Sequence, residues 1–397
     1  MGIKRIAAAA LAAAMLLAAA AGCGKKDSPA ATLEPMEGAA AGETQSSETK
    51  PSEEVKEEAP EVSREDLYSA MRGAFSETTL MAVAGGREVY WPEYCYWLIS
   101  AVEYVLGEAG SLDSWQAQFS GSTAEERVFW ETGEVLKLYR AIELKCEEKG
   151  VTLSEEEEQI ILDYKEELKK TYGGEDEFLA LLEENFMPED TFDYSNRISS
   201  LYYLLFSEMF GVDGADFEDE EAFSFAEQVG YARVKLIYIA LRDGDGKEYD
   251  DAKAQDAKKR AEDIYSRLAA APEEEREALF TELMKEHSED ENLEAYPDGY
   301  SFLRGSGVFS EEFEAAAEME IGEISELIKT ENGYCIFMRT QIDPDSYVDE
   351  TYTLRYYAAM DAFETLAEGW TSEISYSETE AAEALDLEEW LPAPLKY

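Results

Sequence analysis

One apolar segment, YARVKLIYIAL at residues 231–241, limits what this chain can fold into more than any other. It is rich in β-branched and aromatic residues, so we predict a buried strand there. Further strands are predicted at residues 322–326 and 334–340. Helical patterns lie between, at about residues 251–270, 274–287 and 310–318. This order predicts a compact α+β domain of roughly a hundred residues.

The region before this domain has helical periodicity instead. A short strand, a Gly85-Gly86 turn and a returning strand come first, and a run of helices follows. Ser154 and Glu157 form a capping box at the start of one helix, and Pro188 begins a later one. We therefore predict an all-α region with a small β ribbon. An acidic linker at residues 212–221 is expected to join it to the α+β domain.

The length and charge of the chain limit the number of its domains and the kind of partner it can have. The chain has 397 residues, enough for two or three domains, and its formal net charge is -55. A surface this negative repels nucleic acid and anionic lipid, so no nucleic-acid partner is expected. The same charge suits basic or unfolded polypeptides as partners.

Few residues are available for metal or nucleophilic chemistry. Cys95, Cys146 and Cys335 lie far apart and form no CxxC pair, and His287 is the sole histidine of the sequence. The sequence therefore gives little indication of a zinc site built on His and Cys or of a Ser-His-Asp triad. We expect no metal and no cofactor. Among so many carboxylates no spacing singles out a glycosidase pair, although composition does not exclude one.

The N-terminus has the pattern of an export signal. Lys4 and Arg5 precede an apolar run at residues 6–21, and Gly22-Cys23 follows. This ending resembles a bacterial lipobox, in which Cys23 would be lipidated after removal of a signal peptide at residues 1–22. The alternative is an ordinary secretion signal followed by a chance cysteine. Residues 23–64 are polar and poor in large apolar side chains, and we interpret them as a flexible tether.

Three motifs of the α+β domain carry a family resemblance. They are HSED at residues 287–290, GSGVFSEEFEAA at 305–316 and GEISELIKTENGYCIFMRT at 322–340. Residues 228–344 thereby resemble the parvulin-type (PpiC-like) peptidyl-prolyl isomerases, or rotamases.

The helical region before this domain resembles the N-terminal domain of the SurA/PrsA group of extracytoplasmic chaperone-foldases. The segments VTLSEEEEQ and YGGEDEFLALLEE place this likeness in residues 65–222. The resemblance implies that the parvulin-like domain is an insertion. Residues 350–397, a helix and a tail, would then pack back and complete the helical domain.

The resemblance also implies an altered catalytic site. Parvulins usually carry two histidines in the floor of the site, and these positions fall on Tyr238 and Cys335. Asp290 aligns with the acidic or cysteine position of the family. Asp290, Tyr238 and Cys335 are therefore the candidate catalytic residues. Tyr238 and Cys335 have a second interpretation, as part of a repacked strand core.

The apolar residues of the site match the usual parvulin pattern more closely than those of its floor. Phe309 stands where a methionine of the proline pocket is usual, Phe313 matches the pocket phenylalanine, and Val308 lies beside them. Rotation about a prolyl bond has a barrier of about 18–20 kcal/mol and requires no nucleophile. A pocket that grips the proline ring and desolvates the amide lowers this barrier.

These observations predict a lipid-anchored, extracytoplasmic chaperone or foldase with a degenerate parvulin domain. Its partners would be unfolded or nascent exported proteins and their proline-containing segments, bound through a helical cleft. One alternative is an active peptidyl-prolyl cis-trans isomerase, with Asp290 facing Phe309 and Phe313. Another is a structural lipoprotein of the envelope.

Overall fold

The computed structural model describes residues 64–348 and 351–396. The predicted signal peptide, the tether and Cys23 lie outside the described residues. The chain divides into two compact units. Among the described residues, the first unit combines 64–209 with 362–396, and the second lies within 210–361. Within the described part, no helix is both long and apolar enough to cross a membrane.

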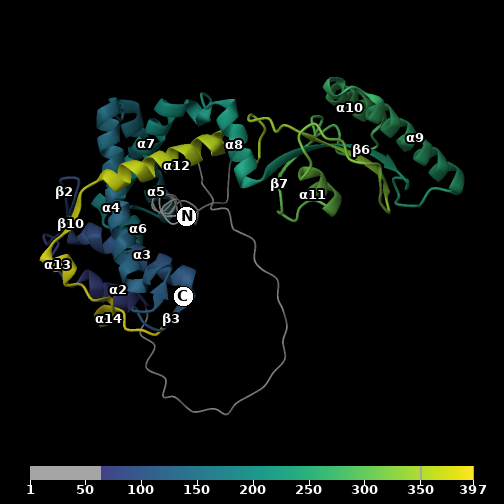
Figure 1. Ribbon diagram of the computed structural model, residues 1–397. Helices are drawn as coiled ribbons and strands as arrows, with labels where there is room; N and C mark the ends of the chain where they lie inside the picture. The colour runs from purple at the N-terminus through teal and green to yellow at the C-terminus, as the bar shows by residue number, and fades with distance from the viewer. Residues whose placement is uncertain (1–63, 349–350, 397) are drawn as a thin grey trace, which may run out of the picture. The chain divides into compact units, whose positions relative to one another are not determined.

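Helices make up most of the first unit (Figure 1). They are α2 (Arg64–Arg72), α3 (Trp91–Ala109), α4 (Ala124–Lys149), α5 (Glu155–Tyr172), α6 (Glu175–Glu184), α7 (Glu189–Phe210), most of α12 (Leu354–Glu373), α13 (Glu380–Glu383) and α14 (Leu387–Trp390). The capping box predicted at Ser154 is present, because its hydroxyl accepts a hydrogen bond from the Glu157 amide and the Glu157 carboxylate accepts one from the Ser154 amide.

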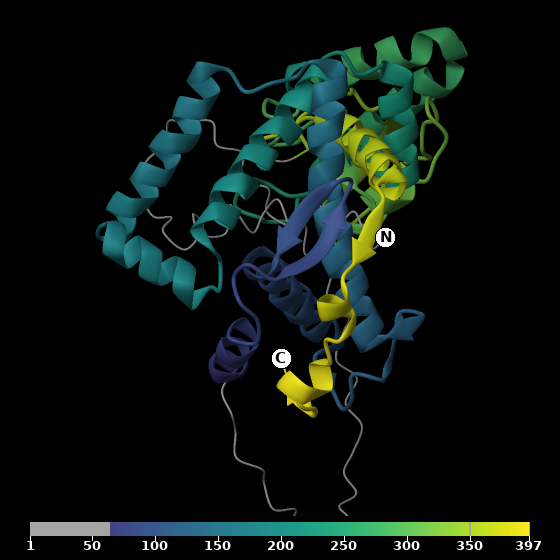
Figure 2. The ribbon, with the colours of Figure 1, turned by 90° about the vertical axis from the view of Figure 1, so that its left-hand side faces the viewer.

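Small sheets tie the C-terminal segment to the N-terminal helices. Strands β1 (Leu80–Ala84) and β2 (Arg87–Tyr90) form the predicted ribbon, and β10 (Tyr376–Glu378) pairs antiparallel with β1 (Figure 2). Two further pairs join β3 (Ser111–Leu112) to β11 (Leu395–Lys396) and β4 (Gln118–Phe119) to β5 (Ser122–Thr123). The C-terminal segment therefore completes the first unit.

The α12 helix packs on α7 through aromatic side chains. Phe363 is fully buried, and its ring lies 4.8 Å from that of Tyr202 and 5.6 Å from that of Phe206, centroid to centroid. Such edge-on aromatic contacts add to the stabilisation from buried area. The predicted architecture, a mostly helical region with an inserted α+β domain and a C-terminal helix that packs back, is confirmed.

The second unit is built on one antiparallel sheet with strand order β7-β6-β9-β8. Its elements are the 3-10 turn η1 (Val212–Gly214), α8 (Asp219–Val229), β6 (Tyr231–Ala240), α9 (Asp251–Ala270), α10 (Glu273–His287), β7 (Tyr300–Leu303), α11 (Glu311–Ala317), β8 (Ile328–Lys329) and β9 (Gly333–Thr340). In Figure 1, α9 and α10 lie on one side of this sheet and α11 on the other.

Each face of the sheet has its own core, because side chains alternate along a strand. Ile237, Ile239 and Ile336 pack with α9 and α10 on one face. Leu236, Cys335 and Phe337 pack with α11 and β7 on the other. The central strands β6 and β9 are paired over eight positions, which fixes this alternation.

Three local predictions differ from the structure. The linker predicted at residues 212–221 gives way to α8 at Asp219, where three consecutive acidic residues favour a helix N-terminus. The strand predicted at 322–326 is reduced to one bridge between Ile324 and Met338. Strand β7 lies in a segment for which no helix or strand was predicted.

Candidate functional site

Tyr238 and Cys335 form a cross-strand pair at the centre of the sheet. They are direct partners in the register of β6 and β9, on the face that α11 covers. Two of the sequence-predicted site residues are therefore neighbours. Neither side chain is suited to proton transfer at neutral pH, for reasons that differ between the two.

The phenol of Tyr238 is engaged locally. Its hydroxyl donates a hydrogen bond of 2.7 Å to the backbone oxygen of Asn332. Its ring lies over Gly333, where an added Cβ would approach Cε2 of Tyr238 to 2.4 Å. Burial is the main reason why the pKa of Tyr238 lies above its ordinary value. The hydroxyl is thus a protonated donor committed to the β8–β9 turn.

Cys335 is buried, and its thiol stays protonated. Burial raises the pKa of Cys335 to about 11, and the negative charges of Glu312 and Asp290 add to the shift. A thiol with such a pKa is neither a nucleophile nor a base at neutral pH.

Asp290 lies at the end of the segment that follows α10. This segment is attached to β6, because the Tyr238 amide donates to Oγ of Ser288 at 3.1 Å and the Glu289 amide donates to the Tyr238 carbonyl at 2.7 Å. The Asp290 carboxylate accepts a hydrogen bond of 2.5 Å from the Tyr300 hydroxyl. Burial and this carboxylate hold the pKa of Tyr300 well above its ordinary range.

An aromatic cluster covers the same face of the sheet. Its members are Tyr300 and Phe302 from β7, Phe309 and Phe313 around the start of α11, and Phe337 from β9. Ring centroids are 4.4 Å apart for Phe302 and Phe309, and 5.1 Å apart for Phe309 and Phe313. The Tyr300 ring lies 5.2 Å from that of Phe313. Through Tyr300, the Asp290 carboxylate is joined to the aromatic cluster.

The structure therefore brings together five of the six sequence-predicted site residues. Tyr238, Cys335, Asp290, Phe309 and Phe313 lie on one face of the sheet or at its edge. Val308 is 78% exposed and lies on the surface beside them.

Sequence reasoning missed Tyr300, Phe302 and Glu312. The first two belong to β7, where no strand was predicted. Their spacing, with Ser301 between them, is the alternation of a strand that presents both side chains to one face. Glu312 stands between Phe309 and Phe313 in the sequence, but nothing in the pattern distinguishes it from its acidic neighbours.

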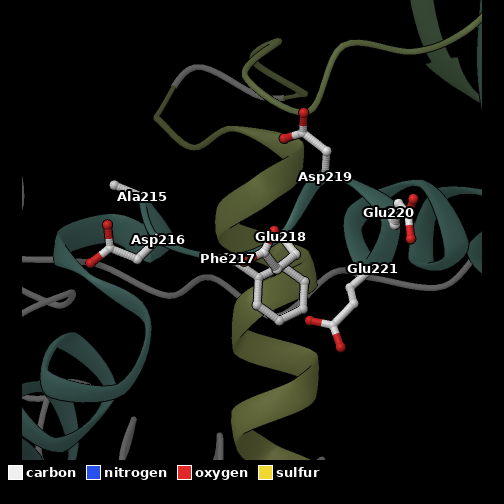
Figure 3. A pocket seen from close by; sticks show the side chains of 7 residues that line it. All are labelled: Ala215, Asp216, Phe217, Glu218, Asp219, Glu220 and Glu221. Atoms are coloured by element: carbon white, nitrogen blue, oxygen red, sulfur yellow. The ribbon is translucent and has the colours of Figure 1, made fainter.

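A separate hollow of about 580 Å³ lies elsewhere in the second unit (Figure 3). It is lined by residues 215–221, including Phe217, and its carboxylates come from both ends of that segment. None of the predicted site residues contributes to it. We found no group of three or more potential ligands placed to hold a metal ion within residues 64–348 and 351–396.

Comparison with protein families identifies the sheet-containing region. Residues 237–341 match the family model described as "Rotamase: PPIC-type PPIASE domain". This range includes Tyr238, Asp290, Phe309, Phe313 and Cys335. The candidate site thus lies wholly within the matched region.

Individual curated relatives match the chain at low sequence identity. The "Foldase protein PrsA" of Staphylococcus aureus strain Newman is 26% identical over 191 residues, which is 48% of this chain and 54% of that protein. The chain therefore spans about half the length of the curated relatives it matches. Identity is the same for the PrsA of strain N315.

Solved structures of PrsA proteins also match the chain, at lower identity. PrsA from Bacillus subtilis covers 72% of this chain at 19% identity, with a TM-score of 0.23. PrsA from Lactococcus lactis covers 79% at 13% identity, with a TM-score of 0.25. These matches extend over 99% of each of those two chains.

Proposed function

This chain belongs to the parvulin-type foldases of the PrsA/SurA group, and on that premise we propose that it assists the folding of exported proteins outside the cytoplasm. Its clients are unfolded polypeptides and their proline-containing segments. The single observation that carries this proposal is the aromatic cluster on one face of the sheet, inside the PPIC-type domain. It offers apolar, polarisable rings where a proline ring would be gripped.

In this proposal the parvulin site is degenerate. Tyr238 is tied to a backbone carbonyl and Cys335 is a protonated, buried thiol. Neither residue can take up and release a proton near neutral pH as histidine does. Rotation about the prolyl bond needs no proton transfer to solvent, so weak activity is compatible with this floor. Binding of the prolyl segment is the main role of the domain.

Client binding by the helical unit is supported by exposed apolar side chains on α5. Ile160 is 61% exposed and Leu162 is 55% exposed, while Leu168 is the buried residue that anchors this helix. The two residues are two positions apart on the helix and point to different sides of it, so each offers a separate apolar contact to a client. Trp130, Leu179 and Tyr203 add exposed apolar area within the same unit.

A client-aggregation assay tests this role. The full chain should suppress aggregation of a chemically unfolded protein, and Ile160→Ser with Leu162→Ser should weaken the suppression several-fold. Glu156→Ser with Glu167→Ser is the matched control, because these residues are exposed on the same helix. If the full chain does not suppress aggregation, the foldase proposal is wrong. If both double variants behave like the parent chain, client binding does not use α5.

The second candidate, an active isomerase, is favoured by one observation. The Asp290–Tyr300 hydrogen bond brings a carboxylate to the edge of the aromatic cluster. A protease-free cis/trans assay on the full chain tests it. Acceleration that Phe313→Ala abolishes supports catalysis in this site. No acceleration by the folded chain leaves the domain as a binding module.

Membrane anchoring is also part of the proposal. It is supported by the lipobox-like ending before Cys23 and by the export-signal pattern of residues 1–22. Labelling with a radioactive fatty acid in a bacterial host tests it. The label should be incorporated into the parent chain and lost in Cys23→Ser. Equal labelling of both would refute anchoring through Cys23.

A further inference from the structure

Asn332 ends the turn between β8 and β9, and Gly333 begins β9. Of the asparagines in the sequence, Asn332 alone precedes a glycine. The backbone nitrogen that follows an asparagine can attack Cγ of its side chain, and a glycine hinders this attack least because it has no Cβ. Asn332 is exposed, so water reaches the side chain. The turn therefore carries a pair of residues that is prone to lose the side-chain amide.

Packing accounts for the glycine of this pair. A Cβ added at Gly333 would come within 2.4 Å of Cε2 of Tyr238 and 2.5 Å of the Ile239 carbonyl oxygen. Contacts this short leave no room for a larger residue. Larger residues are also the ones that slow attack on a preceding asparagine. The close approach of the Tyr238 ring to β9 thus keeps the reactive order of residues in the turn.

The peptide unit that joins the two residues is held at both ends. The Asn332 carbonyl accepts hydrogen bonds from the Tyr238 hydroxyl at 2.7 Å and from the Leu241 amide at 2.8 Å. The amide of the buried Gly333 donates to Oγ1 of Thr330 at 3.1 Å. The nitrogen must lose its proton to attack, so this bond makes it a poor nucleophile. The bonds to the carbonyl keep the peptide unit from turning towards the side chain.

Thr330 closes the turn through its backbone and its hydroxyl. Its amide donates to the Gly333 carbonyl at 2.9 Å, and its hydroxyl also accepts from the Asn332 amide at 3.3 Å. One hydroxyl thus contacts the backbone of both reacting residues. Strand β8 pairs with β9 at only two positions, so this hairpin has few bonds to lose when it opens locally.

We propose that Asn332–Gly333 is a deamidation site, and that Thr330 and Tyr238 hold it inactive until the β8–β9 turn opens. In the open turn the Gly333 nitrogen attacks Cγ of Asn332. The N–Cγ bond forms, the Cγ–Nδ2 bond breaks, and ammonia leaves with the proton of the backbone amide. Water then opens the cyclic imide to aspartate or isoaspartate. Isoaspartate lengthens the backbone by one carbon beside the carbonyl that accepts from Tyr238, so the modification reaches the floor of the candidate site.

The experiment incubates the full chain at pH 8 and reads the peptide that contains Asn332 by mass spectrometry, which resolves the change from amide to carboxyl. We expect slow conversion in buffer and conversion at least about tenfold faster in urea, which removes the hydrogen bonds of the turn. Asn332→Gln should abolish the conversion, because glutamine must close a larger ring. Asn292 is an exposed asparagine before Leu293, and it should keep its amide over the same period.

Matched variants test the two guarding hydroxyls. Thr330→Val keeps the shape of the side chain and should speed conversion in buffer about tenfold, as expected for the loss of one or two hydrogen bonds. Thr330→Ser keeps the hydroxyl and should stay slow. Tyr238→Phe should also speed conversion, whereas Tyr265→Phe, which removes a hydroxyl on the opposite face of the sheet, should not. In urea every one of these variants should match the parent chain, because protection by the fold is then gone.

Two results would overturn the inference. If Asn332 keeps its amide even in urea, the pair is not a deamidation site. If the parent chain converts equally fast in buffer and in urea, or if Thr330→Val matches the parent in buffer, the turn does not guard the pair. Slow conversion in the parent, faster conversion in Thr330→Val and Tyr238→Phe, and equal rates in urea support it.

Discussion

Tyr238 and Cys335 lie opposite each other on the two central strands of the sheet, and the resemblance to parvulins aligns both with histidine positions of that family. Because they are direct partners, both substitutions act on one small region. We predict that Tyr238→His with Cys335→His raises prolyl isomerisation by about tenfold, since each imidazole restores a donor and acceptor pair. A cis/trans assay on the full chain measures this. Tyr238→Phe with Cys335→Ala is the control, and an equal gain in that variant would contradict the prediction.

The Cys335 thiol should resist alkylation in the folded protein. It is 6% exposed, and its pKa is raised to about 11, so its thiolate at pH 8 is about a hundredfold scarcer than in a free cysteine. Iodoacetamide labelling, read by mass spectrometry of the peptide that contains Cys335, checks this. We expect very slow labelling at pH 8, faster labelling as pH rises towards 11, and rapid labelling in urea. Fast labelling without denaturant would mean that the strand pair opens readily.

Glu131 makes the stability of the first unit depend on pH. Burial raises its pKa from 4.5 to about 7, even though it forms an ion pair with Arg127. The folded state therefore favours the protonated carboxyl. The stability that this contributes is complete below pH 4.5 and is lost as pH rises through 7.

Glu131→Gln should consequently stabilise the first unit by about 1–3 kcal/mol at pH 8 and by much less at pH 4.5. Urea unfolding followed by tryptophan fluorescence is the measurement, because all six tryptophans of the sequence belong to the first unit. Glu156→Gln, on an exposed helix face, should have no comparable effect. A gain that is the same at both pH values would show that the charge of Glu131 is not its cause.

The contact of α12 with α7 should be essential to the first unit. Phe363→Ala removes a fully buried ring that touches Tyr202 and Phe206, and we expect a loss of about 3–5 kcal/mol. Leu366→Ala, on the exposed side of the same helix, should cost much less. Tryptophan fluorescence in urea again reports the transition. Similar losses for the two variants would argue against specific packing of Phe363.

The long elements of this fold were predictable because their patterns are local. Helical spacing and caps predict α3, α5 and α7, and the β-branched run predicts β6. Strand β7 was missed because it has only four residues, and its pairing with Val234 and Ala232 depends on chain more than sixty positions earlier. The start of α8 was missed because an acidic stretch indicates a linker as readily as a helix N-terminus.

The site was predictable to the extent that family motifs reach it. Tyr238, Asp290, Phe309, Phe313 and Cys335 were found from motifs that resemble parvulins. Tyr300 was not, since its role follows from a hydrogen bond to Asp290 across a loop that no local pattern describes.

The pairing of β10 with β1 has a consequence for the order in which this protein is assembled. The hydroxyl of Thr379 donates a hydrogen bond to the Leu80 carbonyl across 299 residues of sequence, and β10 ends immediately before Thr379. Because a chain is synthesised from its N-terminus, the edge of β1 is exposed long before β10 arrives. The parvulin-type domain, which is continuous in sequence, is then complete while its host unit is still open. Until β10 arrives, this unit is a partly folded chain with an open strand edge, which is a surface that another strand can pair with.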